Sequence, residues 1–495
     1  MKSFVPVLAA TTIVALCASP LRAQWSTDTL SEARTLISAA TVGDLAFFAG
    51  GTDNVSTVTD VVDVYDAGTD SWSTANLSTP RAVMGVAVLG DRVFFAGGGM
   101  SPTTPSDVVD IYDASLGDPD DPAAWSTASL SQARSFPAGT SVGTKVFFAG
   151  GDTFDSVLGP MVSDVVDIYD ASLGDPGDSA AWSVGTPLSQ ARTLLSATTA
   201  GDQAIFAGGL DGNTPVDTVD IYDDSTGLWS TGQLFVPRTV PYGSATSVGS
   251  LAFFAGGQLT GSFPFSWSNV VDVYNAETGL WTTETMSIAR GQLACAAVGN
   301  TVLFAGGATG ATYVATDAVE FYDVISGQWG PVAHLSQPKL GMAPTSVAGK
   351  ALFAGGGFSP SSSLAGIDVH EPGAWTDLGG GTPGVAGTPW LNGTGSLVGG
   401  TTAGVALKYA PPGALSLAWI ALASTPFSAL GGTVHAFPYS SQLTVLMDGE
   451  GSFSGATTWP VGLPMGTQAW FQFVVQDATS MHGITLSNGV LATTP

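Results

Sequence analysis

Short apolar runs that end in two glycines recur about every fifty residues along the first three quarters of the chain. Each run lacks polar positions, which is typical of a strand buried on both faces, and the glycines that follow permit a tight turn or a close backbone approach. A repeat of this length predicts an all-β fold made of similar units. The seven copies of Phe-Ala-Gly-Gly begin at Phe48, Phe95, Phe148, Phe206, Phe254, Phe304 and Phe353.

Two further patterns follow each double glycine. After a loop of variable length comes a run such as Asp164–Asp170, whose alternation of polar and apolar residues predicts a half-buried strand. The sequence Thr-Gly-Leu-Trp, at Thr226–Trp229 and Thr278–Trp281, is typical of a hairpin turn that leads into a fourth strand. Four strands in each repeated unit predict a radial arrangement of blades, as in a β-propeller. The tyrosines of the third strands are Tyr65, Tyr112, Tyr169, Tyr222, Tyr274 and Tyr322, and the tryptophans of the fourth strands are Trp72, Trp125, Trp182, Trp229, Trp281, Trp329 and Trp375.

A double glycine after an apolar strand, then a tyrosine with an acidic neighbour, then a tryptophan, together resemble the kelch repeat. The resemblance covers residues 24–378 and implies a kelch-like β-propeller, with seven blades of four strands as the natural count. The last unit departs from the pattern, because His370 and Glu371 stand where tyrosine and aspartate are expected. Trp25, ahead of the first full unit, is a candidate for the strand that closes the ring. A six-bladed ring with a degenerate tail is the alternative.

Charge nearly disappears beyond Leu378, where Lys408, Asp448, Glu450 and Asp477 are the only charged residues. Alternating runs such as 469–475 predict a small antiparallel β-sandwich over residues 379–495. This region resembles the low-charge segments that follow repeat domains in large exported bacterial proteins. The resemblance favours a surface-attachment or sorting module, and an end domain that packs on the propeller is an equal alternative.

The first 23 residues predict a secretory signal peptide. Lys2 precedes an apolar stretch that is too short to span a membrane, and small residues lie before Gln24. Removal of residues 1–23 leaves Cys295 as the single cysteine, so no intrachain disulfide is available. It also leaves eleven basic and forty acidic residues, a net charge of about −29. We therefore expect a secreted or cell-surface protein with no membrane span and no nucleic-acid partner, since nucleic acid requires a basic footprint.

The loops between the second and third strands differ most in length and content. In an antiparallel blade these loops share a face with the connections between blades. The loop 258–268 carries Phe263, Phe265 and Trp267 among polar and turn-forming residues. Aromatic faces supply large contact areas, so these three residues form a candidate platform for sugar rings or for a protein partner. The alternative is a loop that folds back over the channel or contacts the C-terminal domain.

An arginine also recurs near this face once in each of the first six units, with Lys339 in the seventh. Such a ring offers bidentate contacts to the carboxylates of an acidic sugar or an acidic peptide. Its regularity instead favours a structural tie between blades, because a residue repeated in every unit usually belongs to the repeat framework. The arginines are Arg34, Arg81, Arg134, Arg192, Arg238 and Arg290, and the carboxylates expected to pair with them are Asp63, Asp110, Asp167, Asp220, Asp272 and Glu320.

Enzyme chemistry has less support in the sequence. Copper oxidases built on kelch propellers need two histidines and a cysteine linked to a tyrosine, whereas Cys295 lies in an apolar first strand and only His334 and His370 fall in the propeller. A sialidase-type site needs a tyrosine and glutamate pair, and none stands out among the six glutamates. The acidic turns 114–119 and 171–176 on the other face match no calcium loop and are expected to be solvated. No catalytic residue, metal or cofactor is therefore predicted.

The sequence thus predicts an exported, non-catalytic recognition scaffold that binds a carbohydrate or protein partner through its propeller loops, first of all through residues 256–272. The alternative is a carbohydrate-active enzyme, sialidase-like or galactose-oxidase-like, with its acid and base in the central channel. An enzyme requires titratable groups that converge in that channel, whereas a binder requires an exposed patch.

Overall fold

The computed structural model of the chain describes residues 24–53, 57–101, 104–241, 243–324, 327–359, 361–371, 375–395, 397, 399–463, 467–480 and 482–494. The expected signal peptide, residues 1–23, lies outside the described residues. Within these residues the chain is almost entirely β-structure, with two short 3₁₀ helices, η1 (Pro122–Ala124) and η2 (Ser179–Ala181). The all-β fold class expected from the sequence is confirmed.

Each repeat unit forms one antiparallel sheet in which consecutive strands pair as neighbours. In the third unit the second strand, β15 (Lys145–Ala149), is buried because it lies between two neighbouring sheets. Phe148 packs in a cluster with Phe94 of the preceding sheet, and Phe147 packs in a cluster with Phe206 of the following sheet. Successive side chains of a strand point to opposite faces, so two adjacent phenylalanines join one sheet to both of its neighbours.

Seven sheets of this kind occur in the described residues, and we number them in chain order. Sheet 1 contains β2 (Ser38–Val42), β3 (Leu45–Ala49), β6 (Val61–Asp66) and β7 (Ser71–Asn76). Sheet 2 contains β8 (Gly85–Leu89), β9 (Arg92–Ala96), β12 (Val108–Asp113) and β13 (Trp125–Ser129). Sheet 3 contains β14 (Ala138–Val142), β15, β18 (Val166–Asp170) and β19 (Trp182–Val184). Sheet 4 contains β20 (Ser196–Ala200), β21 (Gln203–Ala207), β24 (Thr218–Asp223) and β25 (Leu228–Gln233).

The remaining three sheets follow the same plan, with a divided outer strand in sheet 6. Sheet 5 contains β26 (Ala245–Val248), β27 (Leu251–Ala255), β28 (Val270–Asn275) and β29 (Leu280–Thr285). Sheet 6 contains β30 (Ala294–Val298), β31 (Thr301–Ala305), β33 (Val314–Asp323) and the outer strands β34 (Gln328–Trp329) and β35 (Ala333–Lys339). Sheet 7 contains β36 (Ala343–Val347), β37 (Lys350–Ala354), β38 (Leu364–Glu371) and β1 (Gln24–Arg34).

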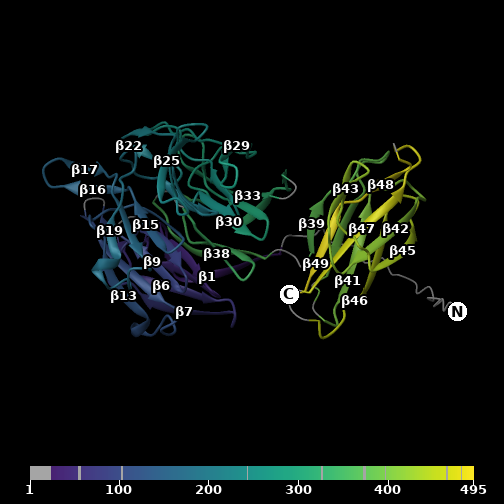
Figure 1. Cartoon of the computed structure of the whole chain (residues 1–495), viewed down its shortest axis with the longest axis horizontal. Coiled ribbons are helices and arrows are strands. Elements are labelled where there is room, and N and C mark those ends of the chain that lie inside the picture. Colours follow the sequence, from purple (N-terminus) through teal and green to yellow (C-terminus); the bar gives the residue numbers. More distant parts are fainter. Residues whose placement is uncertain are drawn as a thin grey trace.

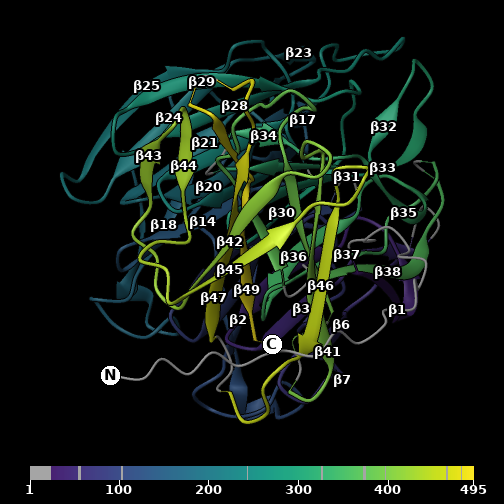
Figure 2. The same cartoon turned by 90° about the vertical axis from the view of Figure 1, so that its right-hand side faces the viewer.

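The sheets stand side by side in a closed ring, which is the arrangement of a β-propeller (Figure 2). Each innermost strand contacts the innermost strand of the next sheet, from β2 to β36, and β36 contacts β2 again. The outer strand of sheet 7 is β1, which pairs with β38 and so joins the two ends of the ring. Trp25 lies opposite His370 in this pair, as Trp72 lies opposite Tyr65 in sheet 1. β1 is therefore the closing strand expected around Trp25.

The structure places the end of the propeller earlier than the expected boundary at residue 378. β39 (Trp375–Gly379) pairs with β49 (Gly489–Thr493) of the C-terminal region, and Trp375 packs against Trp459 and Phe471 there. The tryptophan series predicted that Trp375 lies in the propeller, and this prediction is wrong, because Trp375 belongs to the C-terminal region. The physical reason is the closing strand, because Trp25 already occupies the outer position of sheet 7.

The C-terminal region forms two sheets that share one core. Side chains from both sheets meet in a cluster that includes Leu407, Phe473 and Val490, which is the packing of a β-sandwich. One sheet contains β39, β49, β47 (Gln468–Gln476), β42 (Leu415–Ala421), β45 (Ser441–Leu446) and β48 (Ile484–Leu486). The other contains β40 (Trp390–Thr394), β41 (Thr402–Lys408) and β46 (Phe453–Thr458), and a separate hairpin contains β43 (Phe427–Ala429) and β44 (Gly432–Val434).

The propeller and the sandwich occupy opposite ends of the molecule (Figure 1). The hairpin of β16 (Asp152–Asp155) and β17 (Gly159–Val162) and the short strand β22 (Leu210–Asp211) lie at the end of the propeller farthest from the sandwich. The loops between second and third strands of these sheets therefore point away from the C-terminal domain. Neither 3₁₀ helix of the described residues has the length and apolar character needed to cross a membrane.

Candidate functional site

One face of the propeller is built from the loops between second and third strands and from the connections between sheets. In sheet 3, Ser135 of the incoming connection forms a β-bridge with Asp152, the residue after the double glycine. Six sheets have this bridge, and in sheet 5 the N–H of Thr239 donates to the carbonyl of Gln258 at 3.0 Å. Loops and connections therefore lie side by side, as the repeat topology predicted, and we call this surface the loop face. Its other short strands are β4 (Thr52–Asp53), β5 (Thr57–Val58), β10 (Gly99–Ser101), β11 (Thr104–Pro105), β23 (Thr214–Pro215) and β32 (Ala308–Thr309).

The double glycines hold the loop face together through backbone contacts. The second glycine donates its N–H to the carbonyl of the recurrent basic residue on the next connection, for example Gly151 to Arg192 at 3.0 Å. Gly151 has a φ of 102°, and a Cβ at this position would meet the carbonyl oxygen of Ser135. A side chain is excluded there for both reasons. The motif that marks the repeat therefore shapes the loop face and offers no side chain to a ligand.

The recurrent arginines lie beneath the loop face and have no exposed surface. Arg34 ends β1 of sheet 7, and its guanidinium pairs with Asp63 of sheet 1. The same guanidinium donates to the carbonyls of Gly50 at 2.6 Å and Val61 at 2.8 Å. The backbone N–H of Ser31 donates to the other oxygen of the Asp63 carboxylate at 2.9 Å. One carboxylate thus holds both ends of the connection that leads into sheet 1.

This pairing recurs around the ring and ties each connection to the third strand of the following sheet. Burial lowers the pKa of the six guanidinium groups, and the paired carboxylates oppose that effect. Because every one of these groups is enclosed, none presents a free fork to a ligand, which favours the structural interpretation over the ligand-binding one. The pairs are Arg34–Asp63, Arg81–Asp110, Arg134–Asp167, Arg192–Asp220, Arg238–Asp272, Arg290–Glu320 and Lys339–Asp368.

The aromatic loop of sheet 5 divides into one exposed and one buried ring. Phe263 is 67% exposed, whereas Trp267 is 8% exposed and donates its indole N–H to the carbonyl of Gly310 at 2.6 Å. Tyr313, from the neighbouring loop of sheet 6, lies 4.6 Å from Phe265 and 5.1 Å from Trp267 between ring centroids. The expected platform of three rings is therefore a single exposed ring on a small core that joins two adjacent loops.

The central channel is bordered by the innermost strands, whose side chains are small, apolar or hydroxyl-bearing. Thr41 and Thr345 share a hydrogen bond of 2.7 Å, and so do Thr140 and Thr199. These seven described strands contain no aspartate, glutamate, histidine, lysine or arginine. They supply hydroxyl groups and not the pair of carboxylates that glycoside hydrolysis uses.

The residues considered for copper chemistry lie in separate parts of the packing. Cys295 belongs to β30, where it packs in a core cluster with Phe253 and Phe304, and burial raises the pKa of its thiol. His370 packs against Trp25 and Phe321 in the closing sheet. Both residues are packing residues, as the apolar sequence around Cys295 indicated.

The twin acidic turns lie at the opposite face, where their carboxylates serve local structure. Asp121 and Asp178 cap η1 and η2 by accepting backbone hydrogen bonds. Arg92 pairs with Asp113 at 2.6 Å and with Asp175 of the next turn at 3.0 Å. Among the described residues, no group of three or more histidine, cysteine, aspartate or glutamate side chains is placed to hold a metal ion.

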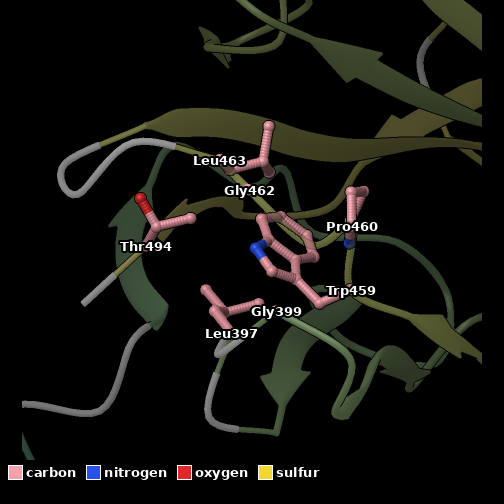
Figure 3. Close-up of a pocket in the computed structure, with 7 residues that line it drawn as sticks. All are labelled: Leu397, Gly399, Trp459, Pro460, Gly462, Leu463 and Thr494. Carbon is pink, nitrogen blue, oxygen red and sulfur yellow. The ribbon is translucent and has the colours of Figure 1, made fainter.

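The sandwich has a partly open pocket of about 130 Å³ (Figure 3). The indole of Trp459 lies between Leu397 and Leu463, with Thr494 on the side toward which the indole nitrogen points. The described lining is formed by apolar residues, glycines and one threonine. The lining residues are Leu397, Gly399, Trp459, Pro460, Gly462, Leu463 and Thr494.

The β16–β17 hairpin is the most prominent loop of the loop face, although the sequence favoured the aromatic loop 258–268 as the first candidate. In the hairpin β16–β17, Val157 is 87% exposed and Leu158 is 73% exposed, and Phe154 and Met161 are exposed beside them. Asp155 accepts the N–H groups of Val157 at 2.7 Å and Leu158 at 2.8 Å, which fixes the turn. Four apolar residues in one loop were a visible signal, but only the structure shows that no other element covers them within the described residues.

A closed ring of four-stranded sheets, each with a double glycine at the loop face and a buried basic residue tied to the next sheet, defines a repeat-built β-propeller. The fold is that of a kelch-like propeller, and one of its repeat units matches a known family model. Residues 191–233, which comprise the end of one connection and all four strands of sheet 4, match the family model for the kelch motif.

Two other comparisons add little to this assignment. A solved structure titled "Structure of YjhT" is similar to the chain with a TM-score of 0.46 and 14% sequence identity. The similarity covers 59% of this chain and 94% of that one, and it is too slight to bear on function. No curated protein matches the chain significantly.

Proposed function

We propose that this chain is an exported or cell-surface, non-catalytic recognition scaffold whose propeller binds a protein or glycan partner at the loop face. The observation that carries the proposal is the contrast between framework and loops. The glycine contacts and the basic–acidic pairs repeat around the ring, whereas the loops between them range from the short β22–β23 hairpin to the projecting β16–β17 hairpin. Side chains that vary on a rigid scaffold are the ones that select a ligand.

The position of the loop face supports this role. Its loops in sheets 3 and 4 lie at the end of the propeller away from the sandwich, so a partner bound there and an anchored sandwich do not compete for space (Figure 1). In this proposal the sandwich attaches the chain to a surface or to a second partner, and the propeller presents its loops outward.

A binding screen on residues 24–495 tests the proposal. The mature chain is applied to a glycan array and to a random peptide library, beside a Phe263→Ala variant and a variant carrying Val157→Ser with Leu158→Ser. Leu280→Ala is the control, because Leu280 is 65% exposed at the opposite end of its strand pair. Ligands that weaken with a loop-face variant and not with the control support the proposal. Ligands that are indifferent to every loop-face change contradict it.

Export is tested separately from binding. The intact mass and the N-terminal sequence of the chain recovered outside the producing cell should place the new N-terminus at Gln24. Recovery of a chain that retains residues 1–23 inside the cell would contradict the exported location without affecting the binding result.

A further inference from the structure

The basic residues of the propeller that reach the surface lie away from the loop face. Seven of its basic side chains, the six arginines of the ring and Lys339, are buried in ion pairs. The other three, Arg92, Lys145 and Lys350, each begin a second strand, at the turn opposite the loop face. The loops of the loop face contain neither lysine nor arginine. Positive charge is thus present at one end of the propeller and missing from the surface of the other.

The same loop face carries many carboxylates in its first four sheets. Two of these groups accept hydrogen bonds from neutral donors, Asp53 from the N–H of Thr57 and Asp211 from the side chain of Gln190. Such bonds orient a carboxylate without cancelling its charge, so this arc carries a negative potential. We call it the acidic arc, and its members are Asp53, Asp60, Asp107, Asp152, Asp155, Asp164, Asp211 and Asp217.

The loops of sheets 5 to 7 have a different character. Between each double glycine and its third strand they contain no aspartate or glutamate. The nearest carboxylate, Asp317, lies within β33, 3.2 Å from Nδ1 of His334. The exposed side chains of these loops include Phe263 and Phe358. The loop face therefore has two halves, one acidic and one aromatic, which recognise different chemistry.

The apolar hairpin β16–β17 stands in the acidic half. Its tip projects beyond the rest of the propeller (Figure 1), and the Asp155 carboxylate holds Val157 and Leu158 in a fixed turn. A fixed, exposed group of aliphatic side chains is unfavourable in water and is typical of a protein contact. Sugar ligands, by contrast, stack on aromatic rings, and Phe154 is the single aromatic residue of this hairpin.

We infer that the acidic arc docks a protein segment that presents lysine or arginine around an apolar centre, with Val157 and Leu158 inserted into that centre. This inference rests on the proposed role of the loop face and adds the class of partner. The aliphatic contact supplies affinity, and the surrounding carboxylates steer basic partners and reject acidic ones.

The test pans a phage-displayed library of random peptides on residues 24–495 and measures the affinity of the selected peptides. The test variant combines Leu158→Ser at the exposed hairpin with Asp107→Asn and Asp164→Asn at exposed positions of the acidic arc. The expected result is a set of peptides rich in lysine or arginine with an aliphatic or aromatic residue, at least tenfold weaker on the test variant and weakened by added salt.

The matched control makes the same changes on the opposite face. It combines Leu116→Ser with Asp118→Asn and Asp120→Asn, in one exposed acidic turn, and should leave affinity within twofold. Both variants must keep the thermal midpoint of the parent chain. Selected peptides without an excess of basic residues, or an equal loss on both variants, would overturn the inference.

Two further outcomes separate this inference from the proposed function. Peptides that lose affinity with Phe263→Ala alone would place recognition in the aromatic half, which keeps the proposed function and removes the acidic partner site. Peptides whose affinity is insensitive to every loop-face variant would contradict both the acidic partner site and the proposed function.

Discussion

Each carboxylate of the ring holds two donors that arrive from a different sheet. In sheet 3 the Asp167 side chain accepts the backbone N–H of Ser131 at 2.8 Å and pairs with the guanidinium of Arg134. Both charges are buried, so their attraction is offset by the cost of removing them from water. The pair therefore contributes more to fixing the position of the connection between sheets than to the free energy of unfolding. Removing one partner should lower that free energy more than removing both.

Arg134→Ala is expected to lower the free energy of unfolding by about 3–5 kcal/mol, because it leaves Asp167 buried without a cation. Arg134→Lys should cost less, since Lys339 makes the equivalent pair with Asp368 at 2.7 Å in sheet 7. Denaturant unfolding measures both values. The double change of Arg134→Met with Asp167→Leu should recover part of the loss. Equal losses for the single and double variants would show that the unpaired charge is not the cause.

Trp267 and Phe263 are expected to differ sharply in their effect on stability. Trp267→Ala removes a buried ring and an indole hydrogen bond and should cost about 3 kcal/mol, whereas Phe263→Ala at an exposed position should stay within about 0.5 kcal/mol. Thermal unfolding of the two variants gives the comparison. Similar shifts for both would contradict the division into a buried and an exposed ring.

This difference was not accessible from the sequence. Phe263, Phe265 and Trp267 look alike in a polar loop, and the ring that packs against two of them, Tyr313, lies in the loop of the next sheet. A local pattern does not encode contacts between loops. The arginines were easier to interpret, because their strict recurrence already indicated a role in the framework.

At the scale of strands, the sequence predicted the elements well where the apolar pattern was strong. The buried second strands and the alternating third strands were evident, since both patterns depend on local periodicity. The outer strands were harder to assign, because a tryptophan marks an outer strand without saying which sheet it joins. Trp375 fits the tryptophan series by its spacing, but its strand pairs in the sandwich. Trp25 occupies the outer-strand position in sheet 7 that the series predicted for Trp375.

The closing sheet contains a histidine where the other sheets have tyrosine. His370 lies 4.9 Å from Trp25 and 5.2 Å from Phe321 between ring centroids, and it is buried. Burial lowers the pKa of His370 to about 4. The folded ring thus favours the neutral imidazole of His370, whereas the unfolded chain more readily binds the proton that makes it charged.

We expect the stability of the closed ring to depend on pH through this residue. The unfolded chain has a histidine pKa of about 6.5, so it binds more protons than the folded chain between pH 6.5 and 4. The free energy of unfolding should therefore fall as pH falls through that window, by up to about 3 kcal/mol from His370. His370→Tyr should remove this component, and the difference between the two pH profiles isolates it from the carboxylates. Parallel profiles would contradict the prediction.

At the scale of the whole molecule, charge is distributed unevenly. The formal net charge is −27, and most of the basic side chains in the propeller are buried in the framework. Each of these buried basic side chains is paired with a buried carboxylate, so the net negative charge remains at the surface, where like charges repel one another.

Moderate salt is expected to raise the melting temperature, because screening weakens this repulsion between exposed carboxylates. Thermal unfolding at low ionic strength and at about 0.15 M sodium chloride, both at pH 7.5, measures the effect. The same comparison near pH 4, where many carboxylates are protonated, should show a smaller shift. A melting temperature that falls with salt at pH 7.5 would contradict the prediction.

The pairing of β1 with β38 also sets the order in which the molecule is completed. β1 is the first described strand of the chain and β38 is the last strand of the ring, so β1 has no partner until every sheet between them has been made. A polypeptide that stops before Glu371 lacks part of β38, so β1 cannot pair along its full length. Closure of the ring therefore depends on synthesis of the complete propeller, because β1 can pair along its full length only after β38 has been made.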